Sequence, residues 1–194
     1  MPGEEDGTVR AFVALDLDAV TLERVAHLSQ GLQAAATAPR ATWTPPEKLH
    51  VTLAFAGALR SDLVDALAGA LQPVAEGVPT PTAHRSWLDA FPSTTKANVV
   101  LVRLQDENGV LAMLAQKIAR LPPLQAVAKA GRAFRPHVTL ARLRRTSDVR
   151  HWLDPQLRAN VGEFRMTALT LYRSDLGASG STYVALGRFA FQED

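Results

Sequence analysis

One five-residue sequence, His-Val-Thr-Leu-Ala, occurs twice in this chain of 194 residues. The first copy begins at His50 and the second at His137. Under uniform residue usage, a chance repeat of this length is expected at the order of a per cent, and more often in an Ala-, Leu- and Val-rich chain. An imidazole can give or take a proton near pH 7, and a threonine hydroxyl can bond to a phosphoryl oxygen. The repeat therefore indicates two equivalent groups suited to acid–base chemistry.

The spacing within each copy places the polar side chains together. Successive side chains of a β-strand point to opposite faces, so His50 and Thr52 share one face, about 6–7 Å apart along the backbone. His137 and Thr139 obey the same rule. The apolar positions that would pack on the other face are Val51, Leu53, Val138 and Leu140. Two such strands facing one cleft would form a symmetric site.

Two opposed pairs of this kind suit the cleavage of a phosphoester. One imidazole can act as the base while the other acts as the acid in a single step. The phosphorus centre needs its attacking and leaving oxygens roughly in line, with hydrogen-bond donors on the remaining oxygens. Two His-x-Thr units can supply both requirements without a metal or another cofactor.

Other roles for the motif residues stay open. A single histidine on a strand is more often structural, and the repetition is what favours a functional role. Histidine also binds zinc well, although neither motif carries a carboxylate at ligand spacing. Nucleophilic attack by Thr52 or Thr139 would require an adjacent base oriented by a third group, and the sequence has no such signature. Hydrogen bonding is the simpler role for both threonines.

The composition limits the available chemistry. The chain has no cysteine, which excludes disulfides, thiolate catalysis and cysteine-based zinc or iron–sulfur sites. The formal net charge is only +2, but arginine is concentrated around the second pentapeptide. These arginines are Arg132, Arg135, Arg142, Arg144, Arg145 and Arg150. They form either a solvated basic face or a site for an anionic ligand.

The start of the chain, residues 1–8, is acidic and lacks a basic segment followed by an apolar one. We therefore expect a loose tail there rather than a secretory signal. The longest apolar runs are far shorter than a membrane span. Together these features favour a cytoplasmic protein that does not enter a membrane.

Hydrophobic periodicity places the motifs on strands between helices. Strands are expected at 9–17, 49–56, 84–91, 97–104, 164–172 and 181–191, besides the second pentapeptide. Helices are expected at 22–32 behind a cap by Asp18, at 61–74, at 110–121 and shortly after Ser147. Gly57 is expected to end the first motif strand, and Pro155 to stop the last helix. The order strand, helix, motif strand, helix occurs about twice, which indicates a divergent internal duplication.

With the motifs placed, the chain resembles the 2H phosphoesterases, which are named for two His-x-Thr-x motifs. Within them it resembles the bacterial and archaeal RNA 2′,3′-cyclic phosphodiesterases, also called 2′-5′ RNA ligases. The segments that carry the resemblance are 10–16, 43–55 and 134–142.

The resemblance implies a bilobal α+β fold, with two pseudo-symmetric sheet-plus-helix lobes around a central cleft and a single domain over 1–194. It also implies metal-independent hydrolysis of RNA 2′,3′-cyclic phosphate ends to 2′-phosphomonoesters. By position, His50 would be the proton donor to the departing 3′ oxygen, and His137 the proton acceptor that activates water. Thr52 and Thr139 would bind phosphate oxygens. The expected partners are RNA ends or nucleotides bearing the cyclic phosphate, bound by a monomer without a cofactor.

The family also places an arginine just after its second motif, near the phosphate, and Arg142 holds that position. Simple alternation opposes this role, because it turns Arg142 to the face opposite His137 and Thr139 unless the strand bends. The sequence departs from the family where Phe55-Ala56-Gly57 replaces Phe-Leu-Gly. It departs again where Asp89-Ala90-Phe91-Pro92 replaces Gly-x-Phe-Pro, which puts packing or nucleoside contacts in doubt more than the reaction.

Aromatic and histidine residues outside the motif pairs are expected to be structural. Trp43, Phe55 and Phe134 flank the motifs and can stack a base, but core packing is the commoner role for aromatics. His27, His84 and His151 lack the motif context, so we expect surface or structural positions for them.

Three other functions stay open at this point. Two keep the chemistry and change the direction or the substrate: 2′-5′ RNA ligation, and hydrolysis of a small cyclic nucleotide. The third is an RNA-end binding protein that captures phosphate without turnover.

Overall fold

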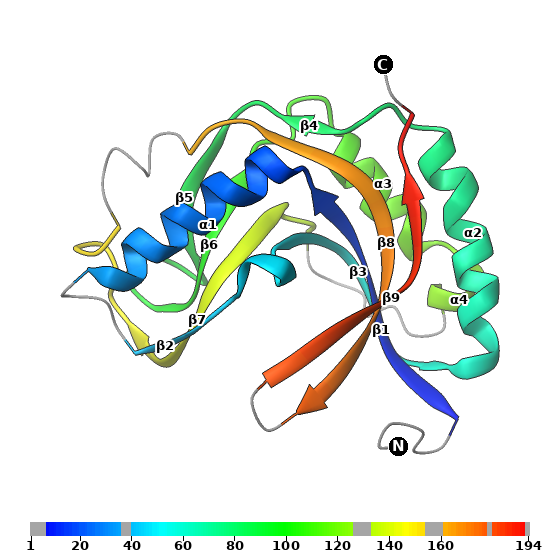
Figure 1. The fold of residues 1–194 in the computed structure, drawn as a ribbon, viewed down its shortest axis with the longest axis horizontal. Coiled ribbons are helices and arrows are strands. Elements are labelled where there is room, and N and C mark those ends of the chain that lie inside the picture. The colour runs from blue at the N-terminus through cyan, green and yellow to red at the C-terminus, as the bar shows by residue number, and fades with distance from the viewer. Residues whose placement is uncertain (1–6, 36–39, 126–132, 154–160, 178–179, 193–194) are drawn as a thin grey trace.

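The computed structural model describes residues 7–35, 40–125, 133–153, 161–177 and 180–192 (Figure 1). The strands are β1 (Thr8–Leu17), β2 (Ala41–Trp43), β3 (His50–Arg60), β4 (Thr82–Ala83), β5 (Ser86–Phe91), β6 (Ala97–Leu104), β7 (His137–Ser147), β8 (Phe164–Gly177) and β9 (Gly180–Ala190). The helices are α1 (Ala19–Ala34), α2 (Val64–Glu76), α3 (Val110–Ala119) and α4 (Pro122–Gln125), with 3-10 turns η1 (Pro46–Lys48) and η2 (Ser61–Leu63).

The strands of the described residues form one nine-stranded sheet in the order β4-β8-β1-β3-β7-β6-β5. In addition, β2 pairs with β7 and β9 pairs with β8. Each of these pairs is antiparallel. The two motif strands, β3 and β7, lie next to each other at the centre, joined where Val51 pairs with Val138. The sheet therefore has two halves, one built around β3 and one around β7.

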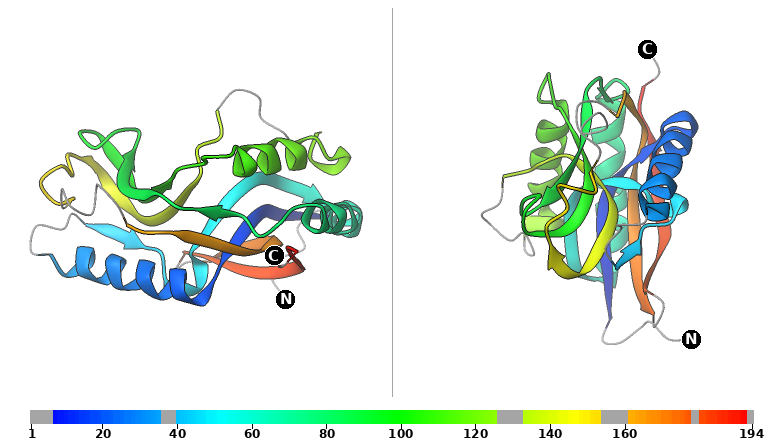
Figure 2. Two further views of the ribbon diagram at one scale, coloured as in Figure 1. Left: turned by 90° about the horizontal axis from the view of Figure 1, so that it is seen from above. Right: turned by 90° about the vertical axis from the view of Figure 1, so that its left-hand side faces the viewer.

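The helices divide between the two ends of the molecule. Figures 1 and 2 show α1 at the end that holds β2 and β7, and α2, α3 and α4 at the other end. As expected, Asp18 caps α1, because its carboxylate accepts a hydrogen bond of 2.7 Å from the Thr21 amide. The helices bury their apolar stripes, for example Leu67 and Leu71 of α2.

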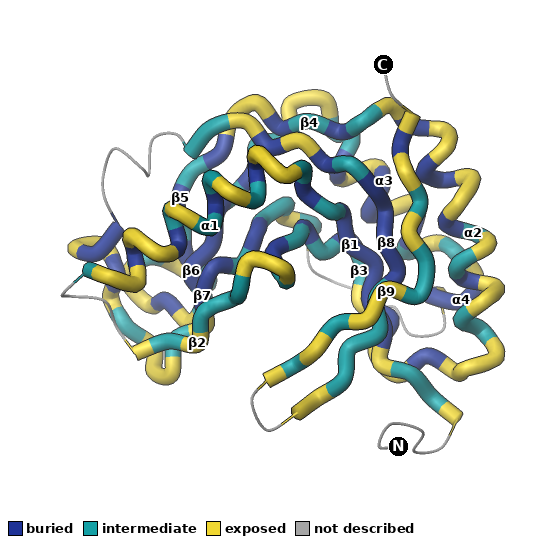
Figure 3. The backbone as a smooth tube through the Cα atoms, viewed as in Figure 1, coloured by how far each residue is buried: buried dark blue, intermediate teal, exposed yellow. Residues whose placement is uncertain are grey.

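Apolar residues of the sheet and the helices form a common core. Figure 3 shows that β1 is buried along most of its length and β8 in its first half, whereas the free ends of β8 and β9 are exposed. No helix in the described parts of the chain is long and apolar enough to cross a membrane.

Both motif strands carry a β-bulge at the same residue of the pentapeptide. Opposite β1, the pairing passes from Thr52 to Ala54, so that Leu53 is an extra residue. Opposite β6, the pairing skips the equivalent leucine, Leu140. A bulge shifts the alternation of faces by one residue. The residue that follows each pentapeptide therefore turns to the same face as the histidine and threonine.

Three expectations about element ends were wrong. Gly57 does not end the first motif strand, because β3 continues to Arg60. Gly57 has a φ of +62° and lies at a second irregularity of the pairing with β1, where its lack of a Cβ permits that backbone conformation. Later in the chain, Ser147 is the last residue of β7 rather than a helix cap, the described residues 148–153 form turns instead of the expected short helix, and Pro155 lies outside the described residues. The expected tail at 1–8 is also too long, because Thr8 already pairs with Arg60.

Candidate active site

A pocket of about 250 Å³ lies where the two halves of the sheet meet. Both motif pairs line it: His50 and Thr52 from β3, and His137 and Thr139 from β7. The structure thus brings together the four residues that the repeat singled out. They share a pocket because β3 and β7 are neighbours in the sheet and the alternation within each strand turns both pairs to one face.

Each histidine is oriented by a backbone carbonyl two residues earlier in the chain. The Nδ1 atom of His50 lies 2.7 Å from the carbonyl oxygen of Lys48. The Nδ1 atom of His137 lies 2.7 Å from the carbonyl oxygen of Arg135. A carbonyl only accepts, so Nδ1 is the donor in both bonds. The Nε2 atom of each ring is therefore the nitrogen that can exchange a proton.

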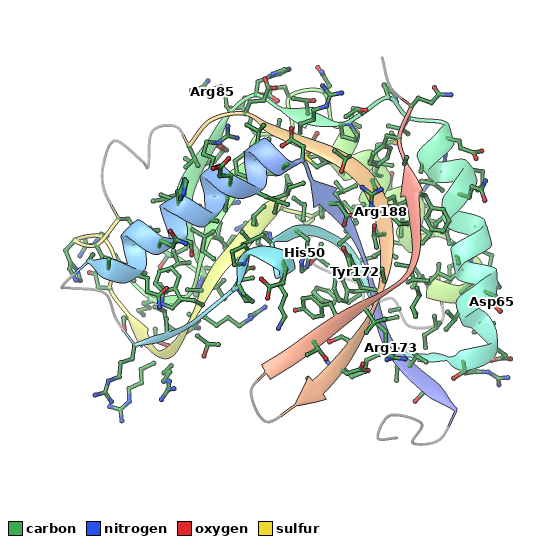
Figure 4. The ribbon with its side chains drawn as sticks, in the orientation of Figure 1. His50, Asp65, Arg85, Tyr172, Arg173 and Arg188 are labelled. Carbon is green, nitrogen blue, oxygen red and sulfur yellow. The ribbon has the colours of Figure 1, made fainter. Side chains whose placement is uncertain are left out.

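The surroundings of the two rings differ in detail. The Nε2 atom of His50 lies 3.0 Å from the hydroxyl oxygen of Thr52. The Phe12 ring packs on His50 at a centroid distance of 5.1 Å, and Tyr183 meets it edge-on at 5.6 Å. Figure 4 shows His50 beside Tyr172, whose ring centroid is 6.3 Å away. Aromatic rings therefore restrict the movement of His50 within the pocket.

Burial dominates the acidity of both imidazoles. It lowers the pKa of His50 below the ordinary value of 6.5, although the carbonyl of Lys48 and the charge of Asp16 act in the opposite direction. Burial also lowers the pKa of His137. There the carbonyl of Arg135 raises the pKa, while the charges of Arg103 and Arg142 lower it further. Both rings thus favour the neutral form more strongly than a histidine in water does.

The β-bulges at Leu53 and Leu140 decide to which face of the sheet the residue after each pentapeptide points. Arg142 lines the pocket with His137 and Thr139, contrary to simple alternation. The reason is the bulge at Leu140, which shifts the alternation of side chains by one residue. It turns the guanidinium of Arg142 toward the pocket, an orientation that the sequence alone did not determine. Whether Arg142 binds phosphate stays a prediction.

The equivalent residue in β3 is Phe55, which also lines the pocket and is 71% exposed. Its expected core role was therefore wrong. The other two aromatics do pack in the core, as expected: Trp43 meets Trp152 edge-on at 5.7 Å, and Phe134 packs against buried apolar residues.

Several pocket residues carried little signal in the sequence. Arg10 and Lys48 line the pocket, and the ammonium group of Lys48 donates a hydrogen bond of 2.8 Å to the Ser181 carbonyl. The β8–β9 hairpin adds Ser174, Ser181 and Tyr183 to the lining. The chain has only two tyrosines, and both lie in this hairpin, where their rings approach His50. The occurrence of both tyrosines in one predicted hairpin was the signal in the sequence that could have indicated its part in the site.

The remaining candidates lie elsewhere. His27, His84 and His151 are exposed, as expected, and His84 forms a 2.7 Å contact with Glu163. Arg135, Arg144, Arg145 and Arg150 are exposed and outside the pocket lining, and Arg132 lies outside the described residues. In the described parts of the chain, no three side chains among His, Asp and Glu are grouped so as to hold a metal ion.

The fold is similar to that of solved structures. The crystal structure of E. coli LigT complexed with NADP+ superposes with a TM-score of 0.72 at 24% identity, over 95% of this chain and 98% of that one. This likeness confirms the expected bilobal α+β fold.

Two curated relatives and one family model match the sequence. An RNA 2′,3′-cyclic phosphodiesterase of Aquifex aeolicus is 26% identical over 153 residues, covering 76% of this chain and 80% of that protein. An RNA 2′,3′-cyclic phosphodiesterase of Methanothermobacter thermautotrophicus is 25% identical over 184 residues, covering 93% of this chain and 98% of that protein. The model of the 2′-5′ RNA ligase superfamily matches residues 20–178. Because that match spans most of the chain, including both motifs, the protein belongs to the 2′-5′ RNA ligase superfamily.

Proposed function

We propose that this protein hydrolyses the 2′,3′-cyclic phosphate of an RNA end to a 2′-phosphomonoester without a metal. The observation that carries the proposal is that His50, Thr52, His137 and Thr139 line one pocket. The names of the two curated relatives support the choice of an RNA cyclic phosphate as substrate.

In this reaction His137 acts as the base and His50 as the acid. The Nε2 atom of His137 takes a proton from water, and the water oxygen attacks phosphorus. The bond between phosphorus and the 3′ oxygen breaks, and Nε2 of His50 gives its proton to that oxygen. The bond to the 2′ oxygen remains, which yields the 2′-phosphomonoester. The carbonyls of Lys48 and Arg135 support these roles, because they hold the Nδ1 protons and leave Nε2 to react.

The phosphate is bound by neutral and charged donors of the same pocket. The hydroxyls of Thr52 and Thr139 bond to its non-bridging oxygens. The guanidinium of Arg142 balances the charge that develops on them. Arg10 and Lys48 add two further cations to the lining, which favours an anionic substrate.

Product analysis on a short RNA that ends in a 2′,3′-cyclic phosphate tests the proposal. We expect phosphorus NMR to detect a 2′-monophosphate, formed at the same rate with and without EDTA. His50→Ala and His137→Ala should each lower turnover about 10²–10⁴-fold, because each removes a proton-transfer group. His84→Ala is the matched control and should keep the wild-type rate, since His84 is exposed and outside the pocket lining.

The proposal fails if either motif variant stays fully active, if the product is a 3′-monophosphate, or if RNA binds tightly with no product. Ligation to a 2′-5′ linkage would be the same displacement with the 5′-hydroxyl of a second RNA in place of water, so that His137 and His50 keep their roles as base and acid. Rates on tRNA halves, short oligonucleotides and mononucleotide cyclic phosphates measure how far each substrate class is used.

A further inference from the structure

The two motif histidines face opposite charges at equivalent positions of the sheet. In the pairing of β1 with β3, Asp16 lies opposite His50. In the pairing of β6 with β7, Arg103 lies opposite His137. Directly paired residues of antiparallel strands share a face, with Cβ atoms about 4.5–5.5 Å apart. An acidic and a basic side chain thus occupy the same place in the two halves, although the motifs are spelled identically.

Asp16 is held in place by three donors. The hydroxyls of Thr170 and Tyr172 donate to its carboxylate at 2.9 and 2.8 Å, and Nε of Arg188 donates at 2.9 Å. The side chain of Asp16 is only 17% exposed, whereas that of Arg188 is 55% exposed. The carboxylate of Asp16 is thus fixed on the strand beside His50, and its charge raises the pKa of that imidazole.

Other charged or titratable groups also surround His50. They are Arg10 of β1, Lys48 of η1, His137 and Arg142 of β7, Tyr172 of β8 and Tyr183 of β9. Burial and the bond to Asp16 raise the pKa of Tyr172, so this tyrosine stays neutral. Asp16 differs from these groups because it is acidic and because it pairs directly with His50 on the neighbouring strand β1.

In the half of the sheet around β7, a basic residue, Arg103, takes the place that Asp16 has beside His50. The Nε atom of Arg103 donates to Asp89 at 2.8 Å, and both side chains are largely buried. Asp89 lies on β5, one strand beyond β6, whereas Arg103 on β6 lies directly opposite His137. Arg142 is a second cation near His137. The charges that act on the pKa of His137 are thus those of two arginines.

We propose that Asp16 and Arg103 are positioning residues that divide the acid and base roles: Asp16 retains the proton on His50, and Arg103 keeps His137 free to accept one. The proposal rests on the proposed function, since it explains how two identical motifs perform opposite proton transfers. It acts through electrostatics alone, because neither residue touches the reacting atoms.

Histidine titration by NMR in the ligand-free protein tests the proposal independently of activity. Asp16→Asn keeps the shape of the side chain and removes its charge, so the pKa of His50 should fall by roughly 0.5–2 units while that of His137 stays in place. Arg103→Gln should raise the pKa of His137 by a similar amount and leave His50 unchanged.

Activity profiles should shift in matching ways. The rate requires a protonated His50 and a neutral His137, so kcat/KM is expected to be bell-shaped in pH. Asp16→Asn should move the alkaline limb to lower pH, and Arg103→Gln should move the acidic limb to higher pH. Each variant should leave the other limb in place.

Arg188→Gln is the matched control for the Asp16 network. It removes the ion pair but retains the carboxylate, so the pKa of His50 should stay or rise. If Arg188→Gln lowers the pKa of His50 as Asp16→Asn does, Asp16 has only a structural role and the proposal is wrong. The proposal is also wrong if Asp16→Asn leaves the pKa of His50 unchanged and Arg103→Gln leaves the pKa of His137 unchanged. If both titrations move as expected but no cyclic phosphate is turned over, the charge asymmetry stands and the proposed function is the part that fails.

Discussion

Val51 of β3 pairs directly with Val138 of β7, and both side chains are fully buried. This contact joins the two motif strands and so connects the two halves of the sheet. The residues lie between the histidine and threonine of each motif but point to the other face. The same pair of strands therefore forms the pocket on one face and packs into the core on the other.

We expect the two halves to unfold together, because the sheet and the core are continuous across this contact. The three tryptophans all lie in the half around β7, so fluorescence reports that half, whereas circular dichroism reports the whole chain. Both signals should follow one urea transition. Val138→Ala should lower the free energy of unfolding by about 1–3 kcal/mol without separating the two signals. Two distinct transitions would show instead that the halves fold independently.

Phe55 should bind the base of the substrate. Its ring is 71% exposed at the pocket, and stacking of a base on an aromatic ring contributes about 1–3 kcal/mol. Phe55→Ala should therefore raise KM about 5- to 150-fold for a nucleotide substrate. A ribose cyclic phosphate that lacks a base should be processed as by the wild type. Val20→Ala is a suitable control, because Val20 is 68% exposed on α1, outside the pocket lining. An equal loss on both substrates would argue against stacking.

Arg142 should contribute to phosphate binding through its guanidinium. Hydrogen bonds to charged groups contribute about 1.5–3 kcal/mol, so Arg142→Gln should lower kcat/KM about 10- to 150-fold. Arg142→Lys should recover only part of this loss, because an ammonium cannot form the bidentate contact. Steady-state kinetics with Arg150→Gln as the control measure the effect, since Arg150 is exposed and bonded to Asp148. Wild-type kinetics in Arg142→Gln would exclude the role.

The two motif histidines should make the stability depend on pH. Because burial lowers the folded-state pKa of both below 6.5, the unfolded chain binds more protons between those pKa values and 6.5. The free energy of unfolding should therefore decrease as the pH falls through this window. Asp148, whose pKa is lowered to about 2 by Arg150, responds only in more acidic solution.

Urea unfolding from about pH 7.5 to about pH 5 measures this dependence. The double variant His50→Gln/His137→Gln should show a flatter decrease, because glutamine does not titrate. The same slope in the double variant would assign the dependence to other groups.

Much of the site could be predicted from the sequence because the signal is local. The repeat of His50 to Ala54 at His137 to Ala141 singled out the four side chains that line one pocket, and period-two alternation put each imidazole and hydroxyl on one face. The helix cap at Asp18 also follows from residues close in the chain. Such features depend on neighbours within a few residues, which the sequence displays directly.

The features decided by tertiary structure all involve strands far apart in the chain. A bulge exists only relative to a paired strand, so the faces taken by Phe55 and Arg142 could not be read from β3 or β7 alone. The contribution of Tyr183 required the hairpin of β8 and β9 to reach the pocket. Likewise, only the register between strands put Asp16 opposite His50. The sequence by itself determined which groups can react, and strand register decided the charges and rings that surround them, because register is set by packing across the whole sheet.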